Sequence, residues 1–325
     1  MSMATQFPVY PPLTLGQILE RIFRLIRSNF KLLLEIGCIP GLAIPITYGL
    51  LFAGMGRQIF AIVQGANPAA YLSQMSIWML GFFAILPVHL AILAIYLAAS
   101  SYAAVLVDCG AVVTFRDAFR VAWLRAGNYL LLVFTIYAVT FLPALLLEIP
   151  MFVMMALVGS HNPAPNPVLI LLFPIEFLLM FGAVIAGALV ALRLSLAFPA
   201  SVLESLNVRV AIKRSWQLTR GVVGRIFLVV LVIYAAVYAL TMVVIGGAIS
   251  VGAIAFFASS GPNDHPSQHT IILLIACAVV VYLVLIAVCT VGMWTGFTTA
   301  FAVIYNDQRR LIGGPATSAP AGAQI

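Results

Sequence analysis

Six long apolar stretches restrict the fold of this chain more than any other feature of its sequence. They cover residues 32–53, 77–106, 130–158, 168–192, 226–257 and 271–305. A helix needs roughly 20 apolar residues to cross a bilayer, so each stretch is long enough to span. The whole chain is 64% hydrophobic and only 8% charged, against about 45–50% and 25% in soluble domains. The sequence therefore predicts an all-α integral membrane protein with six transmembrane helices.

A short basic segment precedes each pair of apolar stretches. The three segments are TLGQILERIFRLIRSNFK (14–31), TFRDAFRVAWLRAGNY (114–129) and NVRVAIKRSWQLTRGVVGR (207–225). Their first ten residues align without gaps, and Phe23, Trp123 and Trp216 then share one column. Such repetition indicates a chain built from one recurring unit. We predict three units in a single membrane domain that covers residues 1–310, with unit boundaries near 14–107, 114–199 and 207–305.

Each basic segment has the pattern of an amphipathic helix. At 100° per residue, apolar side chains fill one arc and polar or basic side chains fill the other, although the second segment is less regular. An aromatic residue at the boundary is typical of a helix that lies in the lipid interface. The alternative is a helix that faces water or simply continues into the next span. Thr14, Thr114 and Asn207 can each cap a helix start, with Gln17 and Asp117 placed to complete capping boxes.

The positive charge of the chain is distributed very unevenly. Six spans with an internal N-terminus place fifteen of the sixteen Lys and Arg residues on one side, and only Arg57 on the other. The positive-inside rule then predicts that both termini are cytoplasmic. Because topology accounts for the basic residues, the net charge of +7 does not indicate a nucleic-acid partner. The outer loops are predicted near 54–76, 159–167 and 258–270.

The units are predicted to form three transmembrane hairpins, arranged about a pseudo-threefold axis. Two small-residue pairs, Gly37–Gly41 and Gly292–Gly296, permit close helix contact and favour packing within the molecule. The tail at 311–325 is rich in Gly, Pro and Ala, a composition typical of disorder. The N-terminal residues lack the apolar core of a cleavable signal, so the first span is expected to direct insertion.

Motifs that would indicate an enzyme do not occur in this sequence. It contains no HExxH, GxSxG, GxxxxGK[ST] or GxGxxG pattern, and its segments outside the spans are too short for a nucleotide-binding domain. Four scattered cysteines form no CxxC pair, and no histidine stands at metal-ligand spacing. We therefore expect a non-catalytic protein without catalytic residues, cofactor or metal.

Two carboxylates inside the second predicted hairpin are the main candidates for an ion or proton site. Glu148 lies in EIP and Glu176 in PIE, mirrored across the hairpin at similar depth. A carboxylate in hydrocarbon is costly, so it must be protonated, paired or in contact with water. His89, in the middle of the second stretch, is a third candidate. Alternatively, all three side chains bond backbone groups left without partners by nearby prolines, or the carboxylates reach the interface.

The amphipathic segments carry the main functional hypothesis. Twelve Lys and Arg residues lie on them, each worth on the order of 1 kcal/mol near an anionic surface. We expect a protein that organises anionic lipid, or a membrane partner, from the cytoplasmic side. The expected lipid contacts are Arg21, Arg24, Arg27, Arg116, Arg120, Arg209, Lys213, Arg214 and Arg220. The alternative is a small transporter or channel that uses Glu148 and Glu176.

Two segments, LTLGQILERIFRLIRSNFKLLL and FPASVLESLNVRVAIKRSWQLTRG, resemble a family of bacterial and archaeal membrane proteins. This family is the membrane domain associated with glycerophosphoryl diester phosphodiesterases, together with related six-span proteins. The matching residues are Leu15, Gly16, Arg21, Arg24, Glu204, Ala211, Arg214, Ser215 and Trp216. The resemblance implies a six-span fold in a prokaryotic cytoplasmic (inner) membrane. It does not imply phosphodiesterase activity, because the chain has no room for the separate catalytic barrel.

Overall fold

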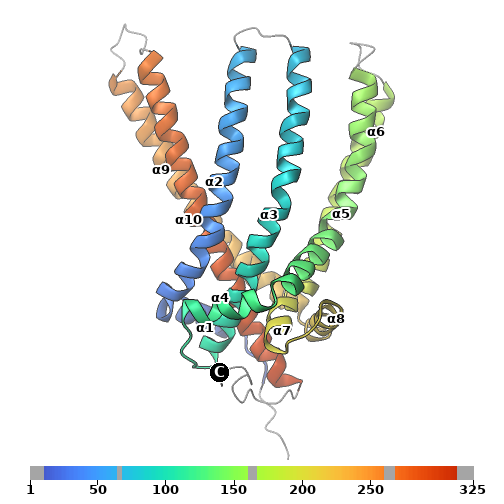
Figure 1. Ribbon diagram of the computed structural model, residues 1–325, viewed down its shortest axis with the longest axis vertical. Coiled ribbons are helices and arrows are strands. Elements are labelled where there is room, and N and C mark those ends of the chain that lie inside the picture. The colour runs from blue at the N-terminus through green and yellow to red at the C-terminus, as the bar shows by residue number, and fades with distance from the viewer. Residues whose placement is uncertain (1–10, 64–67, 160–166, 260–267, 313–325) are drawn as a thin grey trace, which may run out of the picture.

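The computed structural model in Figure 1 describes residues 11–63, 68–159, 167–259 and 268–312. Within these ranges the chain is helical and contains no strand. The helices are α1 (Leu15–Ser28), α2 (Phe30–Val63), α3 (Pro68–Asp108), α4 (Phe115–Leu124), α5 (Ala126–Gly159), α6 (Pro167–Leu194), α7 (Ala197–Leu203), α8 (Val208–Leu218), α9 (Val223–Ser259) and α10 (Gln268–Leu311). Six of them, α2, α3, α5, α6, α9 and α10, are long and apolar enough to cross a membrane. The predicted all-α membrane fold is confirmed.

The long helices pair into the three hairpins α2–α3, α5–α6 and α9–α10 (Figure 1). The short helices α1, α4, α7 and α8 all lie at one end of the molecule, which we call the basic end. Helix α10 packs along both α2 and α3, and α3 packs against α5. The second and third hairpins instead diverge toward the opposite end. The contacts between hairpins are therefore unequal and most extensive between the first and the third.

Small residues permit the closest contact between hairpins, where α2 meets α10. A Cβ added to Gly37 would lie 2.9 Å from the hydroxyl oxygen of Thr295. A Cβ at Gly41 would overlap the side chain of Val291. The Gly37–Gly41 pair therefore packs inside the molecule, as predicted. The second small pair is split, because Gly296 faces Ile233 of α9 whereas Gly292 has open space.

Several element boundaries differ from those predicted. Helix α8 ends at Leu218, and α9 begins at Val223 after a turn. Gly221 in this turn has a φ of +83°, a conformation that stops a helix and favours glycine. The first outer connection is shorter than predicted, because α2 continues to Val63 and α3 starts at Pro68, a favoured first helical residue. Helix α7 was not predicted, and the other two expected loops (159–167 and 258–270) and the tail lie mainly outside the described residues.

Burial is concentrated toward the basic end. Two clusters of buried apolar side chains lie there, and Tyr96, Tyr129 and Tyr305 are among the largest fully enclosed residues. Farther along the hairpins, apolar residues such as Leu146 and Val243 are exposed, at 55% and 73%. Such surfaces are expected where hydrocarbon takes the place of water. The basic end is therefore the rigid part on which functional side chains can be positioned.

Candidate functional site at the basic end

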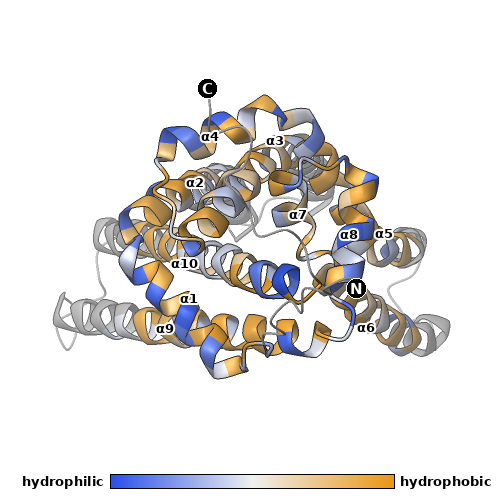
Figure 2. Cartoon of the chain, turned by 90° about the horizontal axis from the view of Figure 1, so that it is seen from below, coloured by the Kyte–Doolittle hydropathy of each residue, from blue (hydrophilic) through white to orange (hydrophobic). Residues whose placement is uncertain are grey.

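The three basic segments form the short helices α1, α4 and α8, which lie around the rim of the basic end (Figure 2). The Thr14 hydroxyl accepts a hydrogen bond from the Gln17 amide, and the Gln17 side chain accepts one from the Thr14 amide. Thr114 and Asp117 repeat this capping box in α4. Asn207 makes no side-chain cap bond. That part of the prediction was wrong, and the third residue of α8, Val210, offers no acceptor to complete a box.

Aligned positions of the repeat have the same environment in all three short helices. Ile18, Ala118 and Ala211 share one column, and all three are fully buried against the hairpins. The aromatic column is exposed in every copy, at 68% for Phe23, 70% for Trp123 and 48% for Trp216. Each helix therefore packs one face on the protein and presents a large aromatic side chain outward. Aromatic residues with this placement suit a membrane interface, where one part of the ring is apolar and another is wet.

The predicted lipid contacts divide into two groups. Seven of the nine side chains are exposed on the basic end: Arg24, Arg27, Arg116, Arg120, Arg209, Lys213 and Arg220. The other two, Arg21 and Arg214, share one column of the repeat and point toward the protein interior, where each pairs with a carboxylate. Their charge is compensated within the protein, so they are poor candidates for lipid contact. The structure corrects the prediction for these two residues.

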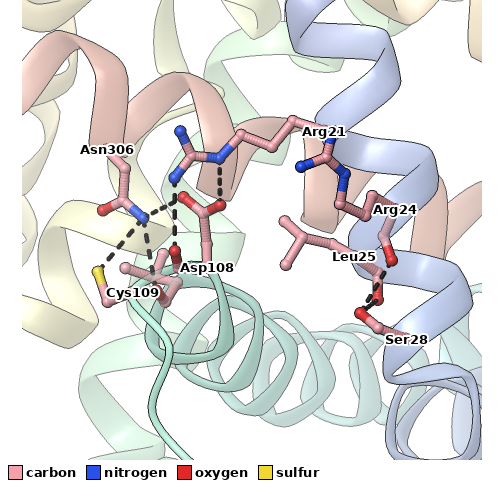
Figure 3. A network of polar contacts seen from close by, with 8 residues as sticks. Arg21, Arg24, Leu25, Ser28, Asp108, Cys109 and Asn306 are labelled. Carbon is pink, nitrogen blue, oxygen red and sulfur yellow. Dashed lines mark hydrogen bonds and ion pairs between the residues drawn. The ribbon is translucent and has the colours of Figure 1, made fainter.

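Arg21 belongs to a polar network that joins α1, α3 and α10 (Figure 3). Its Nε donates to Asp108 Oδ1 at 2.5 Å, and the Asp108 side chain is only 1% exposed. The second carboxylate oxygen accepts from Asn306 Nδ2 at 2.7 Å. Asn306 also donates to the Val105 carbonyl and contacts Cys109 Sγ at 3.7 Å. The Arg21 guanidinium thus compensates the charge of the enclosed carboxylate, and the Asn306 amide satisfies its second oxygen, as burial requires.

Two further carboxylates are held in similar ways. Glu204 lies 3.3 Å from the guanidinium of Arg214 and accepts a 2.7 Å hydrogen bond from the Tyr305 hydroxyl. Asp307 lies 3.8 Å from Arg225. Its other oxygen accepts from the backbone amide of Leu13 at 3.3 Å. Tyr305, Asn306 and Asp307 are consecutive, so the end of α10 joins the end of the first hairpin, the connection between the second and third units, and the residues just before α1 and at the start of α9.

Sequence reasoning gave no role to these three carboxylates, although Glu204 is among the residues that carry the family resemblance. Asp108 and Asp307 stand in the last turns of α3 and α10, and Glu204 follows the end of α6 by ten residues. The chain has only nine acidic residues, so three near the ends of the repeat units were a usable signal. Their partners could not have been deduced in the same way. Asn306, for example, lies 198 residues from Asp108 along the chain.

Two local interactions set the electrostatics of the exposed surface. The guanidinium of Arg193 lies over the ring of Trp216, 4.9 Å from its centroid, within range of a cation–π interaction. Hydrogen bonds from the hydroxyl and backbone amide of Thr114 lower the pKa of Asp117 below its ordinary value. Arg120 and Arg116 add a smaller attraction in the same direction. Asp117 therefore stays ionised at neutral pH beside the N-terminus of α4, where negative charge is favourable.

The predicted ion or proton site lies away from this cluster, in the half of the second hairpin farther from the basic end. Glu148 on α5 is exposed and Glu176 on α6 is partly buried. Gly187 of α6 meets Thr140 of α5. Glu176 lies eleven residues from Gly187 along α6, and Glu148 lies eight residues from Thr140 along α5. Their depths then differ by about 4.5 Å. No hydrogen bond or ion pair between them occurs among the described residues. His89 is buried in a different hairpin, on α3.

The described part of the chain holds no cluster of three or more His, Cys, Asp or Glu residues that could bind a metal ion. The described network residues at the basic end are mainly arginines, carboxylates and amides that pair with one another, although Arg225 Nη1 makes no hydrogen bond. Such pairing is suited to positioning the short helices. In comparisons with known proteins, no family model, curated protein or solved structure matches this chain.

Proposed function

We propose that this chain is a non-catalytic membrane protein that organises anionic lipid through α1, α4 and α8. The observation that carries the proposal is the triple repetition of one surface arrangement. In each copy a buried column holds the helix on the bundle, and an aromatic side chain stands exposed beside basic residues. Packing inside the protein does not account for an exposed aromatic at the same position three times. A lipid interface does, because it accepts both the ring and the cations.

Charge supports anionic lipid as the ligand in this proposal. Seven basic side chains on the short helices are exposed; among the described residues only Arg24 forms an ion pair, with Glu20 at 2.5 Å, and Asp117 attracts Arg116 and Arg120 more weakly. An exposed ion pair of this kind is weak and leaves the cation available. By the positive-inside rule the basic end would face the cytoplasm, in a prokaryotic inner membrane. A membrane-protein partner that presents acidic side chains would use the same surface.

The proposal is tested with the full-length protein and the double substitution Arg116→Gln, Arg120→Gln on α4. Retention of phosphatidylglycerol is compared with retention of phosphatidylcholine, by native mass spectrometry from mixed lipid–detergent micelles. Two charges at about 1 kcal/mol each correspond to roughly a ten- to thirtyfold loss of preference for the anionic lipid. Salt at 0.5 M should remove most of the preference of the unaltered protein.

A matched control tests whether the short helices matter or only the total charge. Arg309 and Arg310 also lie at the basic end, but in the last turn of α10. The substitution Arg309→Gln, Arg310→Gln removes the same two charges and should leave most of the preference intact. An equal loss in both variants would contradict a specific role for α4 and leave only a general effect of net charge.

The second candidate function, a small transporter or channel, draws on the similar depth of Glu148 and Glu176. Two carboxylates about one helical turn apart in depth could share a proton or bind a cation if their side chains turn toward each other. This candidate predicts cation-dependent or proton-coupled flux in proteoliposomes, and its loss in Glu176→Gln. Absence of flux from the unaltered protein, at several pH values and with several monovalent cations, would eliminate it.

A further inference from the structure

A cavity of about 410 Å³ lies where the three hairpins begin to diverge. Its size falls within the range of roughly 300–1,000 Å³ found for ligand pockets. Helices α3, α5, α6, α7, α9 and α10 all contribute to its lining, and most lining residues are apolar, among them Leu97, Val133 and Phe297. Phe141 and Phe227 also line it, and they are 58% and 49% exposed on the outer surface of the bundle. The cavity is therefore open toward the bilayer between the second and third hairpins.

Thr140 gives this cavity a polar group without a partner. Its residue is only 8% exposed, its side chain lines the cavity, and its hydroxyl oxygen makes no hydrogen bond. Five other threonines in the long helices donate to the carbonyl four residues earlier; they are Thr47, Thr135, Thr241, Thr298 and Thr299. Leaving a buried hydroxyl unsatisfied is costly. The Thr140 oxygen is enclosed in this structure, and a ligand with an acceptor oxygen would remove that cost once the side chain turns its hydroxyl toward the cavity.

A cation stands just outside the edge of the cavity nearest the basic end. Leu192 and Leu194 line the cavity, whereas Arg193 does not, and its guanidinium lies over the ring of Trp216 on α8. Hydroxyl groups of Ser215 and Thr219 fix the Arg193 backbone carbonyl, at 2.8 and 3.3 Å. Among the described residues no carboxylate pairs with its guanidinium. Arg193 follows Gly187, which faces Thr140, by six residues, so the two polar groups differ in depth by about 9 Å.

We propose that this cavity binds one glycerophospholipid of the surrounding bilayer. The lipid phosphate lies beside Arg193, an ester carbonyl accepts the hydrogen bond of Thr140, and the acyl chain occupies the apolar space between the hairpins. A phospholipid presents, with increasing depth, an anion, an acceptor oxygen and hydrocarbon. The complementary groups of the protein, Arg193, Thr140 and apolar side chains, follow one another in the same order. The proposal does not rest on lipid binding by α1, α4 and α8, because none of their residues lines the cavity; α8 contributes only by positioning Arg193 through Trp216 and Ser215.

Trp294, which lines the cavity, provides a direct readout. The other three tryptophans are replaced in the full-length chain (Trp78→Phe, Trp123→Phe, Trp216→Phe), so that fluorescence reports Trp294 alone. The protein in detergent micelles is titrated with phosphatidylcholine that carries bromine atoms on one acyl chain. Saturable quenching at a low lipid-to-detergent ratio is expected, because bromine quenches only on contact. The absence of quenching overturns the proposal.

Substitutions at lining and non-lining residues distinguish lipid bound in the cavity from lipid on the outer surface of the bundle. Ala191 lines the cavity, whereas Ala186 is exposed on the same helix and does not line it. Ala191→Phe should reduce the quenching at least twofold, and Ala186→Phe should leave it unchanged. If Ala191→Phe does not fold, Ala188→Phe, at a second lining residue, serves the same purpose. Equal quenching in lining and control variants overturns the proposal, because ordinary lipid contact would then explain the signal.

Two polar substitutions test the assigned contacts. Thr140→Val keeps the shape of the side chain and removes the hydroxyl, so apparent affinity for the brominated lipid should fall about fivefold. Arg193→Gln should lower it by a similar factor. Unchanged affinity in both variants overturns the assignment of the lipid to this cavity. Because phosphatidylcholine has no net charge, loss of the anionic-lipid preference in the α4 variant would not alter these results.

Discussion

At the scale of single residues, the described carboxylates at the basic end fall into two kinds. Asp108 is enclosed, with a side chain 1% exposed between Arg21 and Asn306. Glu20 is paired with Arg24 at the same 2.5 Å, but its side chain is 68% exposed. Burial, not distance, separates the two pairs in energy. Removing one partner of an enclosed pair leaves an uncompensated charge, whereas an exposed pair exchanges its contact for water.

We predict that Asp108→Asn lowers the free energy of unfolding by roughly 2–3 kcal/mol, somewhat below the range for a fully buried pair because Arg21 is partly exposed. Unfolding of the detergent-solubilised protein in increasing SDS, followed by far-UV circular dichroism, measures the change. Glu20→Gln is the matched control and should cost no more than about 0.5 kcal/mol. Equal destabilisation in the two variants would contradict the role assigned to burial.

At the scale of elements, the starts of the short helices were predictable, but not all of their ends. Thr14 with Gln17, and Thr114 with Asp117, form the capping boxes that their spacing predicts, because a cap depends on residues only three positions apart. The end of α8 was placed too late, since Gly221 was not recognised as its stop signal. The ion pairs of Arg21 and Arg214 were missed as well, because residues outside each helix determine which of its cations face inward.

The capping box of α4 contains a titratable group, Asp117, whereas that of α1 contains Gln17. The starts of the two helices should therefore differ in stability at low pH. The pKa of Asp117 is lowered in the folded protein, so its contribution to stability is complete above its ordinary pKa and is lost as the pH falls through the lower, folded pKa. Below about pH 4 the first turn of α4 should therefore fray. Amide hydrogen exchange, corrected for intrinsic rates, should show lost protection at residues 116–118 but not at 16–18, where Gln17 does not titrate. Parallel loss in both helices would contradict this assignment.

At the scale of the whole molecule, hydropathy was enough to predict six spans, because each span is a local property of the sequence. The arrangement of the hairpins was not accessible in this way. It depends on contacts between distant segments, such as Gly41 with Val291. It also depends on how far the second and third hairpins separate. The cavity between them is lined by residues of six helices. The expected threefold arrangement assumed equal contacts between units, and the packing of α10 on the first hairpin is not repeated elsewhere.

The topology itself is a prediction for the whole molecule. In a chain without its four natural cysteines, Ser28→Cys at the basic end and Asn263→Cys between α9 and α10 should react with an impermeant maleimide from opposite sides of inverted membrane vesicles. Ser28→Cys should react from the cytoplasmic side, since fifteen of sixteen basic residues lie at that end by sequence. Labelling of both positions from one side would contradict the six-span arrangement.

The contacts of Tyr305, Asn306 and Asp307 have a consequence for the order in which the molecule is completed. These residues bond the region before the third unit, the end of the first hairpin and the segment before α1. They lie near the end of α10, so a ribosome makes them only after the other nine described helices. The earlier hairpins can enter the membrane before α10 exists, since folding proceeds from the N-terminus during synthesis. Asp108 has no Asn306 amide to accept from until α10 has been made, so closure of the basic end follows insertion of the earlier hairpins.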